Sequence, residues 1–193
     1  MKSKKATSLL SLLLLCTALL LSGCGNKTSS NAKSVSEMAD LIKSSMSFDY
    51  YPDMEADSEV LETIFGLTPD MYDDYFCEIP AISVLSDTLL IVKPADGKKD
   101  AVLSALQSYL DYEQNEAMQY PVNAVQAKAS TVYEAGGYIY YLALFGDVST
   151  AESDDAQLLS LCQDRIKEIE KIIDEADSVS YTHLRAHETL ANL

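Results

Sequence analysis

Carboxylates are the most abundant side chains in this sequence that could do chemistry. Four of them lie close together along the chain: Asp70, Asp73, Asp74 and Glu78. A pair of carboxylates can serve as the acid and the base of a glycosidase-type hydrolase. The chain carries 30 Asp and Glu residues, however, and in so acidic a sequence such a cluster more often forms a solvated face. We therefore predict no catalytic residue, and a cell-envelope hydrolase with paired carboxylates remains the alternative.

Two thiols, Cys77 and Cys162, form the next candidate pair. Cys77 lies on a predicted strand and Cys162 on the apolar stripe of a predicted helix, so the two side chains could meet. An extracytoplasmic location permits a disulfide, whereas a free cysteine is also among the residue types most often buried. The sequence leaves both alternatives open, with Cys77 and Cys162 as a candidate disulfide.

Tyrosines gather around one predicted hairpin, at Tyr133, Tyr138, Tyr140 and Tyr141. Side chains alternate along a strand, so Tyr138 and Tyr140 share one face while Tyr141 points to the other. Tyrosine offers a large amphipathic contact area and is enriched at binding surfaces, although cross-strand packing explains such residues equally well. We predict a candidate binding surface for a peptide or a glycan at Tyr133, Tyr138 and Tyr140.

The beginning of the chain has the features of a secretory signal. Lysines precede an apolar run from Leu9 to Leu21, which is shorter than the roughly 20 residues that a membrane-spanning helix needs. The order Leu21-Ser22-Gly23-Cys24 resembles a bacterial lipobox. We predict a lipoprotein signal peptide at 1–23, a lipid on Cys24 and a flexible tether over 24–33. An ordinary signal peptide with an incidental cysteine is the alternative.

The end of the chain, 179–193, is predicted to be a non-native tail. The segment from Val179 to Thr189 matches, codon by codon, a translated transposon-end sequencing adapter. The chain's two histidines, His183 and His187, both lie there. Their spacing would suit two ligands of one metal ion on a helix, but we exclude them with the tail. Without histidine, the Ser-His-Asp and Cys-His arrangements are missing, and we expect no metal and no cofactor.

The charge balance excludes one class of partner. The chain has 14 Lys and Arg residues and a formal net charge of -16. Nucleic-acid binding needs clustered cations that release counterions from phosphates, so we expect no nucleic-acid partner. The hydrophobic content of 48% is sufficient for a folded core.

The residues between the two ends, 34–178, are predicted to form a single domain. Apolar periodicity and caps indicate helices, and β-branched runs between turn residues indicate strands. Hairpin-linked strands form an antiparallel sheet. The expected fold is α+β in two layers, with a four-stranded antiparallel sheet (a ββαββα core), helices packed on one face, and N-terminal helices before it. Helices are expected at 34–46, 57–65, 98–118 and 151–176, a single turn at 71–75, and strands at 76–85, 88–92, 127–133 and 138–145.

Several stretches of this chain resemble one family of short lipoproteins from Gram-positive bacteria, a domain of unknown function, DUF4358. The resemblance rests on the lipobox, on 68–75 (Thr-Pro-Asp-Met-Tyr-Asp-Asp-Tyr), on 88–97 and on the strand entry at Gly136. It covers most of 35–176 and implies a location and a fold, without an established activity.

Taken with the anchor, the resemblance leads us to expect a non-catalytic binding or accessory module on the outer face of the cell membrane. It would contact membrane lipid through acylated Cys24 and would bind an envelope protein or a small ligand. A structural subunit of a membrane complex is a further alternative.

Overall fold

The computed structural model describes the backbone of residues 33–82 and 84–190, and the side chains of 33–82 and 84–178. The predicted signal peptide, Cys24 and almost all of the predicted tether lie outside these residues. The helices are α2 (Val35–Ser45), α3 (Ser58–Phe65), α4 (Lys99–Asn115), α5 (Pro121–Ala127) and α6 (Asp155–Leu190). The strands are β1 (Met54–Glu55), β2 (Tyr72–Ile79), β3 (Thr88–Pro94), β4 (Thr131–Ala135) and β5 (Tyr138–Ala143).

The sheet has the strand order β1-β2-β3-β5-β4, and each neighbouring pair is antiparallel. The prediction of an α+β fold with an antiparallel sheet is therefore confirmed. The expected number of four strands is wrong, because β1 adds a fifth strand at one edge. This strand is only two residues long, with Met54 opposite Ile79 and Glu55 opposite Glu78, and so short an edge strand has no recognisable sequence pattern.

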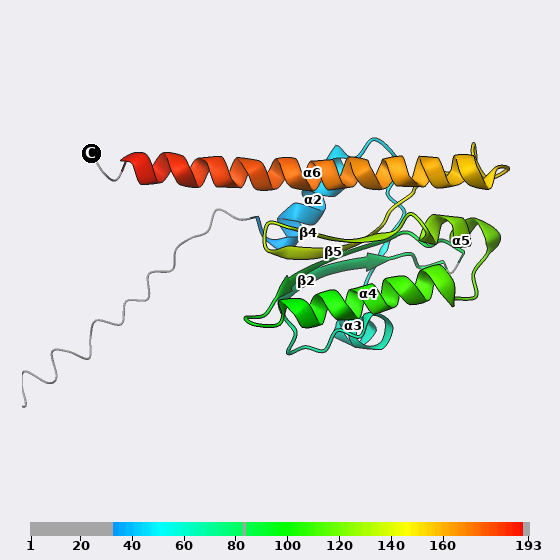
Figure 1. The fold of residues 1–193 in the computed structure, drawn as a ribbon, viewed down its shortest axis with the longest axis horizontal. Helices are drawn as coiled ribbons and strands as arrows, with labels where there is room; N and C mark the ends of the chain where they lie inside the picture. Colours follow the sequence, from blue (N-terminus) through cyan, green and yellow to red (C-terminus); the bar gives the residue numbers. More distant parts are fainter. Residues whose placement is uncertain (1–32, 83, 191–193) are drawn as a thin grey trace, which may run out of the picture. The chain divides into compact units, whose positions relative to one another are not determined.

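Helices cover both faces of this sheet (Figure 1): α2 and α6 lie on one side, and α3 and α4 lie on the other. On β5, Tyr141 packs against Tyr109 of α4, with ring centroids 5.1 Å apart. On the neighbouring strand β4, Tyr133 points the opposite way and its hydroxyl donates to Asp174 of α6 at 2.5 Å. The expected two-layer arrangement with helices on one face is therefore wrong, and the domain has three layers.

Several expected elements keep their places while their boundaries shift. The structure replaces the turn expected at 71–75 with the start of β2 at Tyr72, where a β-bulge follows. The residues expected to begin a strand at 127 end the short helix α5 instead, and β4 begins at Thr131. Pro121 opens α5 at its first turn, where proline fits because no backbone N–H is needed there.

Local signals explain where the long helices begin. Ser34 and Glu37 form the expected capping box of α2, in which each side chain bonds to the backbone of the other residue. Asp154 caps α6 by accepting from the N–H groups of Ala156 and Gln157. The backbone helix of α6 runs on to Leu190, into the segment that the sequence attributes to an adapter, and the origin of that segment stays a prediction. Within the described part of the chain, no helix is long and apolar enough to cross a membrane.

Candidate functional site

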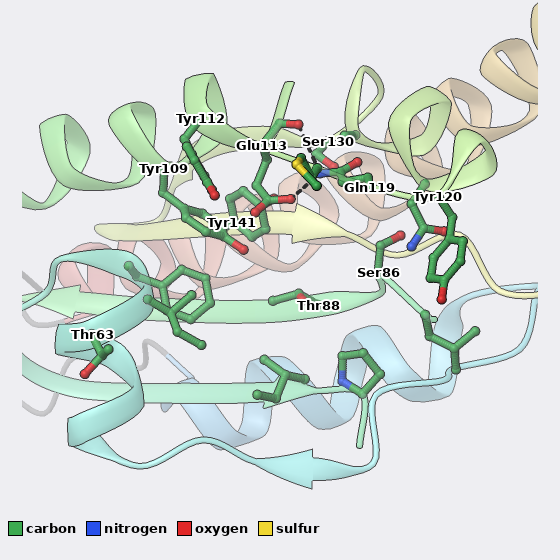
Figure 2. Close-up of a pocket in the computed structure, with 18 residues that line it drawn as sticks. Thr63, Ser86, Thr88, Tyr109, Tyr112, Glu113, Gln119, Tyr120, Ser130 and Tyr141 are labelled. Atoms are coloured by element: carbon green, nitrogen blue, oxygen red, sulfur yellow. Dashed lines mark hydrogen bonds between the residues drawn. The ribbon is translucent and has the colours of Figure 1, made fainter. Parts of the chain in front are cut away.

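A groove of about 1030 Å³ opens on the face of the sheet that carries α3 and α4. Figure 2 shows Tyr109, Tyr112 and Glu113 projecting from α4 toward the strands, with Thr63 of α3 across the groove. Strand residues, including Thr88 and Tyr141, form its floor. The groove therefore lies over the sheet, between α3 and α4.

Three aromatic rings join the floor to the two walls. Phe65 of α3 packs edge-on against Tyr109 of α4, with ring centroids 4.7 Å apart. Tyr141 of β5 lies 6.0 Å from Phe65 and 5.1 Å from Tyr109. Burial raises the pKa of both tyrosines. Edge-to-face packing of this kind stabilises the walls beyond the area that it buries.

The end of the groove nearest α5 is polar, and Glu113 is its centre. Burial raises the pKa of the Glu113 carboxyl, while hydrogen bonds from Tyr109 and Gln119 oppose this rise. The Nε2 atom of Gln119 donates to the Glu113 backbone oxygen at 3.0 Å and to the Glu113 Oε2 atom at 2.5 Å. Among the described residues that line the groove, Glu113 is the only one with an ionisable acidic or basic side chain at neutral pH.

Buried amides hold the loop between β2 and β3 against α5 and so close this end of the groove. The Nδ2 atom of Asn123 donates to the backbone oxygen of Val84 at 3.1 Å. The hydroxyl of Ser86 donates to the Oε1 atom of Gln126 at 3.0 Å. Asn123 and Gln126 are both buried, so this loop is fixed by polar contacts that water cannot easily replace.

In the part of the chain that the structure describes, the large hydrophobic side chains that are exposed to solvent gather at this groove. Ile64, Tyr112, Met118 and Tyr120 line it. Met54 lies opposite the lining residue Ile79 on the neighbouring strand. The other two belong to the loop between the lining residues Pro80 and Leu85, namely Ile82 and Val84. A concentrated apolar patch of this kind is typical of a ligand or protein binding site.

A sequence model for a domain of unknown function (DUF4358) matches residues 46–144, slightly more than half of the chain. The chain belongs to the DUF4358 family. No curated protein and no solved structure matches the chain. The matched segment of this DUF4358 protein includes the residues that line the groove, whereas α2 and α6 lie outside it. The groove is therefore built within the part of the chain that defines the family.

The tyrosines predicted as a binding surface lie away from this groove, on the opposite face of the sheet. Tyr140 is fully buried and Tyr138 is 7% exposed. Tyr138 donates to the backbone oxygen of Lys33, and Tyr133 donates to Asp174. The space beside Tyr138 and Tyr140 measures about 20 Å³, which is enough for one water molecule and too small for a peptide or a glycan. Tyr138 and Tyr140 therefore pack under α2 and α6, whereas the Tyr133 side chain stays partly exposed beside α6.

Among the described residues of the DUF4358 protein, Cys77 and Cys162 have free, buried thiols. Cys77 shares its register row with Leu90 and Tyr141, which places it on the face of α3 and α4. Cys162 lies on α6, across the sheet. The candidate disulfide is therefore not formed in the structure, because the sheet separates the two sulfurs. Burial raises the pKa of Cys77 to about 12 and that of Cys162 to about 11, so both thiols stay protonated.

The acidic cluster does not form a carboxylate pair over a shared cavity. Asp70 accepts from Lys98 at 2.6 Å, and this contact and a hydrogen bond from Thr68 lower the pKa of Asp70. Glu78 lies on the face toward α2, where it accepts from the hydroxyl of Tyr50 and pairs with a lysine. Asp73 pairs with Lys93 at 3.7 Å, and Asp74 accepts from the backbone N–H of Tyr75. No group of three or more metal-binding side chains occurs among the described residues.

Sequence reasoning missed the groove residues Glu113, Gln119 and Tyr112. The spacing of Tyr109, Tyr112 and Glu113 by three and four places them on one face of a helix. That signal was present, but it does not distinguish a groove wall from a packed helix.

Proposed function

We propose that this protein is a lipid-anchored binding or accessory module on the outer face of a bacterial cell membrane, and that it binds its partner in the groove. The anchor is supported by the order Leu21-Ser22-Gly23-Cys24 after a lysine-rich start and an apolar run. The observation that carries the binding role is the concentration of exposed apolar side chains along one groove. Monomeric proteins rarely expose such a patch unless it has a partner.

Lipidation is tested by intact mass and detergent partitioning of the chain expressed from its gene in a Gram-positive host. We expect a mature species that begins at diacylglyceryl-modified Cys24 and enters the detergent phase, because each buried CH₂ of an acyl chain contributes about 0.8 kcal/mol of membrane binding. The Cys24→Ser variant should lack the lipid. A wild-type protein that is secreted without lipid would contradict the anchor.

Binding in the groove is tested by photo-crosslinking in intact cells. A crosslinking amino acid replaces Met118, which is fully exposed at the groove. The matched control carries it at Lys171, which is exposed on α6 on the other side of the sheet. We expect a discrete adduct at Met118 and none at Lys171.

The same adduct should disappear when Ile64, on the α3 wall, is replaced by Ser. Ile64 is 43% exposed, so its replacement alters the groove surface without opening the core. Equal adducts at the two crosslinker positions, or an adduct that is indifferent to Ile64→Ser, would contradict binding in this groove.

A further inference from the structure

The polar end of the groove has more hydrogen-bond acceptors than donors. The Glu113 carboxylate accepts from Gln119 and from Tyr109, whereas an ionised carboxylate can accept about four hydrogen bonds. Beside it, the Oε1 atom of Gln119 is buried and has no hydrogen-bond partner among the described residues. The orientation of this amide is fixed, because its nitrogen donates to two oxygens of Glu113. This corner can therefore accept further hydrogen bonds from a ligand that carries donors.

A cationic side chain of a ligand would supply hydrogen-bond donors to Glu113 and Gln119. An ammonium group carries about three donors and a guanidinium about five, and neither carries an acceptor that would compete. A hydrogen bond from such a group to a carboxylate is about twice as strong as one between neutral groups. The described residues that line the groove include no lysine and no arginine that could already donate to Glu113.

The rest of the groove favours a ligand that carries apolar groups beside its cation. Ile64, Met118 and Tyr120 are exposed along the walls, and burying them under apolar atoms is favourable. The volume of about 1030 Å³ reaches the upper end of the roughly 300–1,000 Å³ that drug-sized ligands occupy. A chain of several residues fits this space better than a single small molecule does.

Charge narrows the choice of partner further. A second copy of this chain would bring another net charge of -16, and like charges disfavour association. An anionic ligand would meet the Glu113 carboxylate, and no described lining residue carries a compensating positive charge. The acidic molecule attracts a basic partner instead and speeds its encounter.

We infer that the ligand of this groove is a basic, apolar peptide segment of a partner protein, with one Lys or Arg side chain seated against Glu113 and Gln119. Apolar side chains on either side of that cation contact the exposed walls. This inference rests on the proposed binding function and names the class of its partner.

Panning of a random dodecapeptide library on phage tests the ligand class. The target is the full chain purified from membranes of its host and held in nanodiscs of neutral phosphatidylcholine, and empty nanodiscs give the background. We expect the enriched peptides to carry a Lys or Arg flanked by apolar residues. Enrichment of acidic or uncharged peptides, or no enrichment at all, would overturn the inference.

The position of the cation is tested with one enriched peptide and two matched variants of the protein. Glu113→Gln removes the carboxylate in the groove, and Glu116→Gln removes the same charge from an exposed position that does not line it. We expect Glu113→Gln to weaken binding about tenfold and Glu116→Gln to change it by less than about twofold. Equal effects of the two substitutions would mean that only the net charge matters, which contradicts the seat at Glu113.

A change in the peptide avoids any effect of these substitutions on folding. Replacing the enriched Lys or Arg with norleucine should weaken binding to the wild-type protein as much as Glu113→Gln does, and the two changes together should add little. Binding that survives this replacement would overturn the inference. Should a neutral oligosaccharide of N-acetylglucosamine bind in place of the peptides, the ligand class is wrong while the binding function stands. If the crosslinker at Met118 gives no adduct in cells, the proposed binding function itself is contradicted.

Discussion

Asp87 is a buried carboxyl group in the core, and its ionisation should make the stability of this domain depend on pH. Its side chain is 2% exposed, and its Oδ1 atom accepts from the backbone N–H groups of Phe145 at 2.7 Å and Gly146 at 2.8 Å. Burial raises the pKa of the Asp87 carboxyl, against the opposing effect of these two amides and of Arg165. The folded state therefore favours the protonated form. Protonated Asp87 therefore contributes to the unfolding free energy. This contribution is fully present below the unfolded-state pKa and is lost as the pH rises through the folded-state pKa.

As the pH rises from about 3 to about 7, ionisation of buried Asp87 should lower the unfolding free energy. We predict that this decrease is smaller in Asp87→Asn, because asparagine keeps an acceptor and cannot ionise. Urea unfolding across this range measures the slope. Asp40→Asn, at an exposed position on α2, removes the same charge and is the control. If the wild type and Asp87→Asn lose stability with the same pH dependence, the buried carboxyl does not titrate in this way.

At the scale of elements, a comparison of two glycines distinguishes the cost of backbone strain from the cost of a steric clash. Gly97 and Gly146 both have positive φ, 73° and 57°, a conformation that costs other residues about 1–2 kcal/mol. A Cβ at Gly97 would meet no atom of the described residues within 4 Å, whereas a Cβ at Gly146 would lie 2.6 Å from the backbone oxygen of Asp49. We expect Gly97→Ala to lower the unfolding free energy by about 1 kcal/mol and Gly146→Ala by about 1–3 kcal/mol more. Equilibrium urea unfolding of both variants measures this difference, and equal losses would argue against the close approach of the two loops.

The sequence predicted the elements whose signals are local. The capping box at Ser34 and Glu37 marked the start of α2, and Gly66 marked the end of α3, where the structure has a left-handed cap. β2 was placed too late, because Asp73 and Asp74 weaken its strand pattern and a bulge interrupts its pairing. The ends of helices were therefore predictable where a capping residue fixes them. The ends of strands were unreliable where they depend on pairing with another strand.

The layers and the groove depend on contacts between distant parts of the chain. The apolar run of β3 from Leu89 to Val92 is buried throughout, and a run without polar alternation is typical of a strand covered on both faces. That signal for a third layer was present. The site is different, because α3, α4 and α5 meet only in the folded chain, and one groove residue, Glu113, is one of 30 acids.

The whole molecule is dominated by its negative charge. It has 30 acidic and 14 basic residues, so many carboxylates have no cation to pair with. Most of the ion pairs among the described residues are well exposed, as in Lys98 with Asp70, and exposed pairs contribute little stability. Lys43 with Glu78 is the more buried exception. Repulsion between unpaired carboxylates should therefore outweigh attraction within the ion pairs.

We predict that sodium chloride stabilises the folded protein at neutral pH. Raising the salt from about 10 mM to about 150 mM shortens the Debye length from about 30 Å to about 8 Å, which screens repulsion among the carboxylates. The urea midpoint should therefore rise with salt. At a pH near the sequence pI of 4.3 the net charge is close to zero, so the same salt should have little effect. An equal rise at both pH values would mean that salt acts through burial of apolar surface, and would argue against repulsion as the cause.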